Sequence, residues 1–276
     1  MRSILLPIDF SKNSESSLLF GLNLSKKEKL KAIILHVVSP YSGLDNNIYQ
    51  IFDYSIYLEE RKKATEDYLF KFKQKNNLSK LATEVICESG TVADSILKIS
   101  KEQAAELVVM GAIGSGNISR IVVGSNTQFV LGLSKIPLLI IPQGFKYEDY
   151  NRKICFATDF HLKLNKASLA IFESFSFIKS ATVQFVHISD EKYPIFKEKH
   201  TELVALLFGK LKTRIKYIFS KNLTDSLEAF MQASESSLLV LLPHSHNFLY
   251  YLFFRGHTIS VVKKLKYPVL VLYDLK

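Results

Sequence analysis

An internal repeat constrains the fold of this chain more than any other feature. The segment Arg2–Ser11 recurs as Arg152–His161, at a spacing of about 150 residues. Three more segments recur in the same order: Ile33–Ser39 as Val183–Ser189, Glu106–Met110 as Leu238–Leu242, and Lys135–Ile141 as Lys266–Leu272. Because the order is kept, the chain is predicted to be a tandem duplication of one domain. We place the two copies at residues 1–146 and 151–276, with Tyr147–Asn151 as the linker.

The composition is that of a globular protein with two domains. The chain has 276 residues, of which 47% are hydrophobic and 22% are charged, so each copy can bury a core of its own. Cys87 and Cys155 each lie within an apolar, strand-like run. Two cysteines cannot form a disulfide framework or a cysteine-rich metal site, and buried, reduced thiols are the expected state.

Charge and hydropathy argue against two classes of partner. The net charge is +10, but the basic residues are spread along predicted helices and mixed with acidic ones, as in Glu59–Lys63. This pattern indicates a solvated face, so no nucleic-acid partner is expected. No apolar run reaches the length of about 18 residues that a membrane span needs. Pro7 and Asp9 interrupt the first apolar run too early for a signal peptide. We therefore expect a cytoplasmic protein without a membrane partner.

Short apolar runs alternate with longer helical patterns in the first copy. The runs are apolar at successive positions, as in strands that are covered on both faces. Strands are predicted at 3–8, 32–38, 82–87, 106–110 and 137–142, and helices at 12–26, 50–75, 92–104 and 124–134. Ser11 and Thr91 are the predicted N-caps of the first and third helix. The alternation predicts the α/β class, with two doubly wound, parallel, five-stranded sheets of Rossmann-like type, one in each copy.

A glycine-spaced loop, Gly111–Ser125, follows the fourth predicted strand. It would lie at the carboxyl ends of the strands, where ligands of such folds bind. Its glycines permit close approach of a ligand to the backbone, and Gly124–Thr127 opens the next helix. The free N–H groups of that helix start and the hydroxyls of Ser125 and Thr127 would form an anion cradle. No Gly-Lys-Ser/Thr follows the glycines, so the loop is not a P-loop, and its position excludes a dinucleotide fingerprint. On these residues alone, a phosphate site and a plain loop are both open.

The spacing Gly-x2-Gly-x9-Gly-Ser resembles the ATP-binding signature of universal stress proteins, and it is met by Gly111, Gly114, Gly124 and Ser125. Three other segments are similar to landmarks of the same family: Leu6–Ser11 to its first strand, Leu35–Val38 to the end of its second strand, and Gly90–Ile96 to the start of its third helix. The resemblance spans nearly all of the first copy. It implies an adenine-nucleotide α-hydrolase-like fold that binds ATP, with or without Mg²⁺.

The resemblance also implies roles for individual residues. Asp9 would hydrogen-bond the adenosine, because a carboxylate accepts from a ribose hydroxyl or from the adenine amino group. Pro7 and Ile8 would form the floor beneath it, although the family usually has a small hydroxyl residue where Ile8 stands. The remaining contacts are implied as follows: Val37 and Met110 for adenine, and Gly111, Gly114, Gly124, Ser125 and Asn126 for ribose and phosphates.

The second copy departs from this pattern. Aligning Gly256 with Gly124 replaces three members of the signature: Gly111 by Pro243, Gly114 by His246, and Ser125 by His257. Proline cannot take the positive φ that is open to glycine, and two imidazoles would crowd the phosphates. The second copy is therefore predicted to bind no nucleotide.

Histidines are the other candidate ligands. His244, His246 and His257 are of metal-ligand type, but spacing within a loop fixes no geometry, and no metal site is expected. His36 and His187 fall within predicted strands and are expected to be hydrogen-bonded core residues.

No catalytic arrangement is visible around the glycine loop, so the predicted function is regulatory ATP binding and not catalysis. A slow ATPase and a nucleotide-free scaffold that uses the apolar run Phe248–Phe254 stay open as alternatives. Universal stress proteins commonly pair through their last strands. In a tandem chain this pairing would be internal, between strands 137–142 and 268–273. The expected partners are thus an adenine nucleotide and the other copy, with a homodimer of the whole chain left open.

Overall fold

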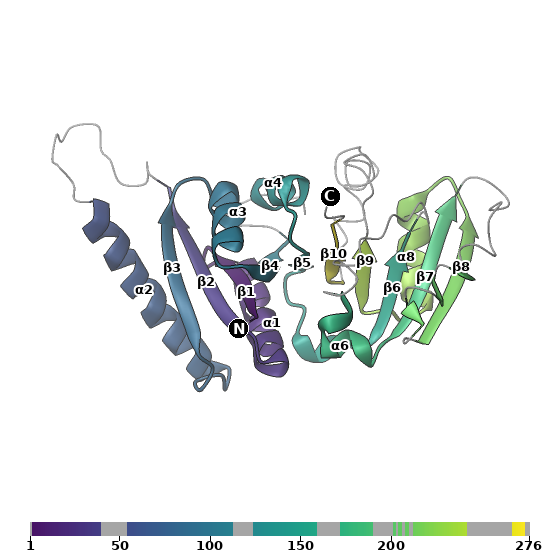
Figure 1. Cartoon of the computed structure of the whole chain (residues 1–276), viewed down its shortest axis with the longest axis horizontal. Coiled ribbons are helices and arrows are strands. Elements are labelled where there is room, and N and C mark those ends of the chain that lie inside the picture. Colours follow the sequence, from purple (N-terminus) through teal and green to yellow (C-terminus); the bar gives the residue numbers. More distant parts are fainter. Residues whose placement is uncertain are drawn as a thin grey trace.

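The computed structural model describes most of the chain, and Figure 1 shows its elements as one long sheet with helices on both faces. The described residues are 2–39, 54–112, 124–158, 172–189, 201–202, 204–205, 208–209, 212–241 and 267–273. In the first half the elements are β1 (Ser3–Ile8), α1 (Lys12–Glu28), β2 (Lys31–Val38), α2 (Tyr54–Lys75), β3 (Thr83–Ser89), α3 (Val92–Glu102), β4 (Ala105–Gly111), α4 (Ser125–Leu133) and β5 (Leu138–Ile141). In the second half they are η1 (Tyr147–Asp149), β6 (Lys153–Ala157), α6 (Ser176–Lys179), β7 (Thr182–Ser189), β8 (Lys212–Phe219), α8 (Leu223–Ala233), β9 (Leu238–Leu241) and β10 (Val269–Val271).

Helices α1 and α3 begin directly after the N-cap residues that the sequence predicts. The Ser11 side chain accepts a hydrogen bond from the Ser14 N–H, and the Thr91 side chain accepts one from the Asp94 N–H. Each bond satisfies one of the N–H groups that a helix start leaves without a partner. Both predicted N-caps are confirmed, and every strand and helix expected in the first half is present.

The strands form a single mixed sheet of the α/β class. Among the described residues its order is β3-β2-β1-β4-β5-β10-β9-β6-β7-β8, so each half contributes five strands in the same arrangement. Within each half all neighbouring strands are parallel. In the first half, a described helix connects each strand to the next, as parallel neighbours require. The α/β class and the parallel sheets that the sequence predicts are confirmed.

One antiparallel pair joins the two halves. Val269 lies opposite Ile140, Leu270 opposite Leu139, and Val271 opposite Leu138. The two five-stranded sheets that the sequence predicts are therefore continuous in the structure, and these are the two strands that were expected to pair. The pair also removes one edge from each sheet, and open edges are sites of unwanted strand pairing.

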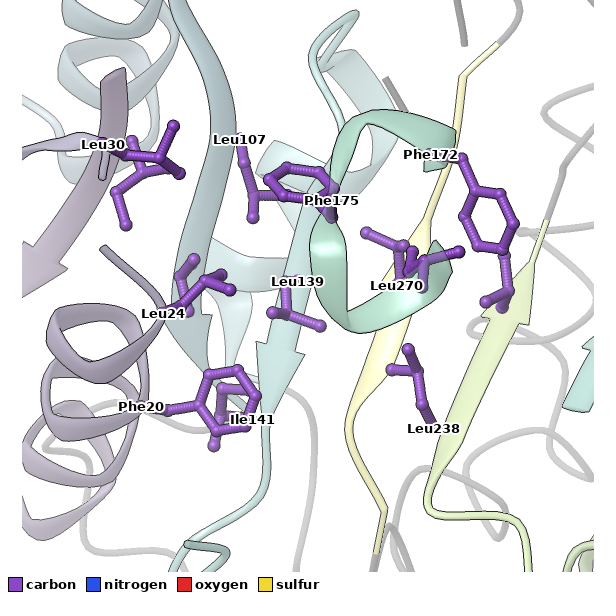
Figure 2. Packing of buried hydrophobic residues seen from close by; sticks show 14 of the residues in the cluster. Phe20, Leu24, Leu30, Leu107, Leu139, Ile141, Phe172, Phe175, Leu238 and Leu270 are labelled. Carbon is purple, nitrogen blue, oxygen red and sulfur yellow. The ribbon is translucent and has the colours of Figure 1, made fainter. Parts of the chain in front are cut away.

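Two hydrophobic cores lie on opposite faces of this sheet, and each contains residues of both halves. Helices α1 and α2 cover the first core, and helices α3, α4 and α8 cover the second. Figure 2 shows how Phe172 and Phe175, near α6, pack over the joint between the halves, beside Leu107, Leu139 and Leu270. These contacts close the first core across the antiparallel pair.

Further contacts tie the two halves together. The Arg2 guanidinium lies 5.6 Å from the centre of the Phe175 ring and donates a hydrogen bond to Ser174. On the other face, the buried Tyr273 hydroxyl donates to the Leu131 carbonyl oxygen at 3.0 Å. The joint thus combines apolar packing with cation–π and hydrogen-bond contacts.

No helix in the described part of the chain is both long enough and apolar enough to cross a membrane.

Packing at the joint gives a first prediction. Phe175 is 1% exposed, whereas Phe219, on the edge strand β8, is 57% exposed. Phe175→Ala should lower the free energy of unfolding by about 3–5 kcal/mol because it leaves a cavity in the shared core. Phe219→Ala, the matched control, should change it by less than about 0.5 kcal/mol. Urea unfolding measures both values, and equal losses would contradict the packing at the joint.

Candidate functional site

The candidate site lies where the connections of the first half diverge. Strands β1 and β4 are neighbours in the sheet. Helix α1, which follows β1, packs into the first core, and helix α4, which follows β4, packs into the second, on the opposite face. The two helices that follow these strands therefore lie on opposite faces of the sheet, so the carboxyl ends of β1 and β4 form a switch point of the sheet. Open α/β sheets bind ligands at such a point.

A tight turn holds Asp9 at the end of β1. The Asp9 Oδ1 accepts two hydrogen bonds from Ser11, one from its N–H at 3.1 Å and one from its hydroxyl at 2.6 Å. Between them, Phe10 has a φ of 61°, in the left-handed region that a bulky residue rarely adopts. Its ring is held by His36, with centroids 4.7 Å apart, and by Tyr68, at 4.9 Å. The surrounding side chains thus stabilise an uncommon backbone turn at this strand end.

The end of β4 approaches the first turn of α1 closely. A Cβ atom on Gly111 would lie 3.0 Å from the Asn13 carbonyl oxygen and 3.1 Å from its carbonyl carbon. Only glycine fits this approach without moving the helix backbone. The Oδ1 atom of Asn13 is buried, and it has no hydrogen-bond partner among the residues that the structure describes.

Helix α4 begins beside the same strand end. The Gly124 N–H donates to the Ala112 carbonyl oxygen at 3.0 Å and closes the connection that starts at Gly111. Gly124 is the N-cap of α4 and offers no side-chain cap, while Ser125 and Asn126 are exposed on the first turn. The first N–H groups of a helix have no partner within it, and they carry the positive end of the helix dipole. This helix start has the character of an anion-binding site.

The structure changes the expected role of Thr127. Its side chain is 2% exposed, and its hydroxyl donates to the Gly111 carbonyl oxygen at 3.2 Å. The expectation that this hydroxyl faces a phosphate is wrong, because the hydroxyl is already used to fasten α4 to β4. Ser125 keeps an exposed hydroxyl at the start of the same helix.

Three of the residues expected around the adenosine lie on one face of the sheet. Met110 is part of the second core, and Val37 packs against it. Pro7 alternates with Ile8 along β1, so it falls on the same face as these two. The Ile8 side chain instead lies in the first core, on the other face, and is 6% exposed. Ile8 can therefore offer its backbone to this face, but not its side chain.

The two histidines that lie in strands, His36 and His187, form hydrogen bonds to the backbone, as expected. The Nδ1 atom of His36 donates to the Ile8 carbonyl oxygen at 3.1 Å, and that of His187 donates to the Thr158 carbonyl oxygen at 3.0 Å. Both rings are half-buried. Each histidine therefore ties the second strand of its half to the end of the first strand.

Burial shifts the pKa of several titratable groups in the protein. Burial raises the pKa of Tyr68, and the Glu15 carboxylate, which accepts a hydrogen bond from its hydroxyl, raises it further. Both cysteines are free thiols, and burial raises the pKa of each. These thiols are therefore held in the protonated form, which is poorly nucleophilic.

Several predicted residues lie outside the described parts of the chain. In the first half this concerns Gly114. In the second half it concerns the whole degenerate pattern and the candidate metal ligands, namely Pro243, His244, His246, Gly256 and His257.

The geometry agrees with the comparison of this chain with known proteins. Residues 1–142 match the sequence model of the universal stress protein family. The chain belongs to this family. The universal stress protein YxiE of Bacillus subtilis is 30% identical over 144 residues, which is 50% of this chain and 97% of that protein. A universal stress protein of Methanocaldococcus jannaschii is 24% identical over 155 residues, or 51% of this chain and 94% of the relative.

Two solved structures extend the likeness of fold to the whole chain. The crystal structure of a universal stress protein from Archaeoglobus fulgidus has a TM-score of 0.73 at 20% identity and covers 98% of both chains. A universal stress protein structure from Pseudomonas aeruginosa has a TM-score of 0.59 at 12% identity and covers 99% of this chain and 93% of its own. At these identities the likeness concerns the fold alone.

Sequence reasoning missed three features of this site. These are the bond from Ser11 to Asp9, the contact of Asn13 with Gly111, and the bond from Thr127 to Gly111. The first had a signal in the Asp-Phe-Ser order, since serine two residues after aspartate can bond back to it. The other two join strand and helix ends whose approach becomes known only with the fold.

The approach at β4 gives the second prediction. Gly111→Ala should lower the free energy of unfolding by about 1–3 kcal/mol, because the new methyl group displaces the α1 backbone. Gly132→Ala is the matched control. A Cβ there meets no atom within 4 Å, and alanine should stabilise the helix by about 0.5–1 kcal/mol. Thermal and urea unfolding compare the two, and a neutral Gly111→Ala would contradict the close approach.

Proposed function

We propose that the first half of this protein binds ATP at the carboxyl ends of β1 and β4. The observation that carries the proposal is the position of the two described ends of the glycine-spaced segment: Gly111 ends β4, the neighbour of β1 in the sheet, and Gly124 bonds back to Ala112 at the start of α4. In this proposal, the backbone that binds the phosphates and the carboxylate that binds the nucleoside would meet at the switch point of the sheet. Membership of the universal stress protein family supports the same reading.

Each end of the nucleotide has matching chemistry. Asp9 would accept from a ribose hydroxyl or from the adenine amino group, and Pro7, Val37 and Met110 would supply the apolar surface for the base. The Ile8 backbone completes this side. The phosphates would lie against the backbone at the remaining positions, with Mg²⁺ as their counter-ion where it is present: Gly111, Gly114, Gly124, Ser125 and Asn126.

The proposed role of this binding is regulatory. The glycines are not followed by the lysine of a P-loop. The segment is therefore suited to binding phosphates and not to phosphoryl transfer. Occupancy of the proposed site would bridge β1 and α4, and α4 contacts the second half through the Leu131–Tyr273 hydrogen bond. A nucleotide could thereby change the surface near the joint.

We also propose that the two halves form a pseudo-dimer within the chain. Residues 1–146 and 151–276 would be the two domains, and the second would bind no nucleotide because its pattern has lost the glycines. The β5–β10 pair supports this proposal. A cytoplasmic location and a homodimer of the whole chain stay predictions.

ATP titration followed by calorimetry tests the proposed site. Asp9→Ala and Ser125→Ala should each weaken ATP binding about tenfold or more, since each removes a hydrogen bond to a charged or polar group of the ligand. Asp67→Ala and Ser79→Ala, at exposed positions away from the proposed site, are the matched controls. A protein without measurable ATP affinity would favour a scaffold. Phosphate release that Asp9→Ala abolishes would favour an ATPase.

A further inference from the structure

We infer that Ser11 is a positioning residue for the nucleotide, because its hydroxyl fixes the carboxylate of Asp9. The inference rests on the proposed ATP site. Its basis is a set of three hydrogen bonds at one residue: the Ser11 N–H and hydroxyl both donate to Asp9, and the hydroxyl oxygen caps α1.

The geometry separates the two tasks of the Ser11 hydroxyl. Its oxygen accepts from the Ser14 N–H at 3.2 Å and thereby caps the helix. Its O–H group donates to the Asp9 Oδ1. The two oxygens are 2.6 Å apart, a short distance that is typical of a hydrogen bond to a carboxylate. Because the hydroxyl accepts and donates at once, the start of α1 and the Asp9 side chain are fixed relative to each other.

Both Ser11 donors fall on the same carboxylate oxygen. The backbone N–H bonds Oδ1 at 3.1 Å, and the hydroxyl bonds it at 2.6 Å. Two bonds to one oxygen restrict rotation of the carboxylate and thus set where Oδ2 lies. A preorganised acceptor binds its ligand more tightly than one that must first be ordered.

The turn between the two residues supports this reading. Phe10 stays in the left-handed region, with a φ of 61°, because its ring packs against His36 and Tyr68. This conformation turns the chain back, so that Ser11 reaches the side chain two residues before it. Uncommon backbone conformations of this kind persist where the surroundings hold them, and they are concentrated at functional sites.

The repeat gives an internal comparison at the level of sequence. The second copy keeps Asp159 and Phe160 but has His161 in the place of Ser11. It has thus lost the short hydroxyl at the same time as the glycines. The loss of both features in the copy without a glycine cradle is consistent with a shared role in nucleotide binding.

The test compares ATP affinity with stability in variants of the full chain. Ser11→Ala removes the cap and the donor. Ser11→Gly removes the hydroxyl donor, but glycine is an acceptable N-cap, so this change should cost little stability. Ser11→Thr retains both the cap and the hydroxyl donor. Thr91→Ala is the matched control, because Thr91 caps α3 through the same kind of hydrogen bond and follows β3, which is two strands away from β1 in the sheet. Asp9→Ala reports whether the proposed site itself is correct.

We expect Ser11→Ala and Ser11→Gly to weaken ATP binding about tenfold, as the loss of one hydrogen bond to a charged group does. Ser11→Thr should bind within about twofold of the unchanged protein. Thr91→Ala should lower the Tm by as much as Ser11→Ala but leave the ATP affinity unchanged. If Ser11 were only structural, the two variants would not differ in ATP affinity.

Three results would overturn the inference. Unchanged affinity in Ser11→Ala and Ser11→Gly, together with weak binding in Asp9→Ala, would refute the role of Ser11 and leave the ATP site intact. An equal loss of affinity in Thr91→Ala would show that Ser11 acts through stability alone. Unchanged affinity in Asp9→Ala would refute the proposed site, and the role of Ser11 with it.

Discussion

The antiparallel pairing of β5 with β10 is the interaction on which the rest of the structure depends. Three opposed residue pairs turn two parallel sheets into one sheet of ten strands. Because the pairing is in the middle of the sheet, both cores continue from one half into the other. The second half is thereby part of the support for the first, through Phe175 below Arg2 and through Tyr273 bound to Leu131.

Within this sheet, two local constraints shape the ends of β1 and β4 at the proposed site. Gly111 lets β4 approach α1, and the uncommon turn at Phe10 brings Ser11 back to Asp9. Each costs conformational freedom or strain, and the packed surroundings offset the cost. These two strand ends are therefore held in place by the protein itself, which lowers the ordering that a ligand there must induce.

Local signals explain why much of this could be predicted from the sequence. The strands of the first half are apolar runs, the caps at Ser11 and Thr91 act within three residues, and the glycine spacing is a linear pattern. Contacts between distant residues had no such signal. The Thr127 hydroxyl was expected at a phosphate but bonds Gly111. Ile8 was expected in the floor beneath the adenosine, and its side chain lies in the first core. Both differences arise because side-chain direction depends on which face each strand and helix covers.

The central claim is that the chain is an asymmetric pair, with one half that binds ATP and one half that does not. The number of ATP molecules bound per chain at saturation tests it most directly, measured by calorimetry on the full-length protein with and without Mg²⁺. The account predicts one ATP per chain. Two per chain would show that the second half also binds nucleotide, and none would contradict the ATP site itself.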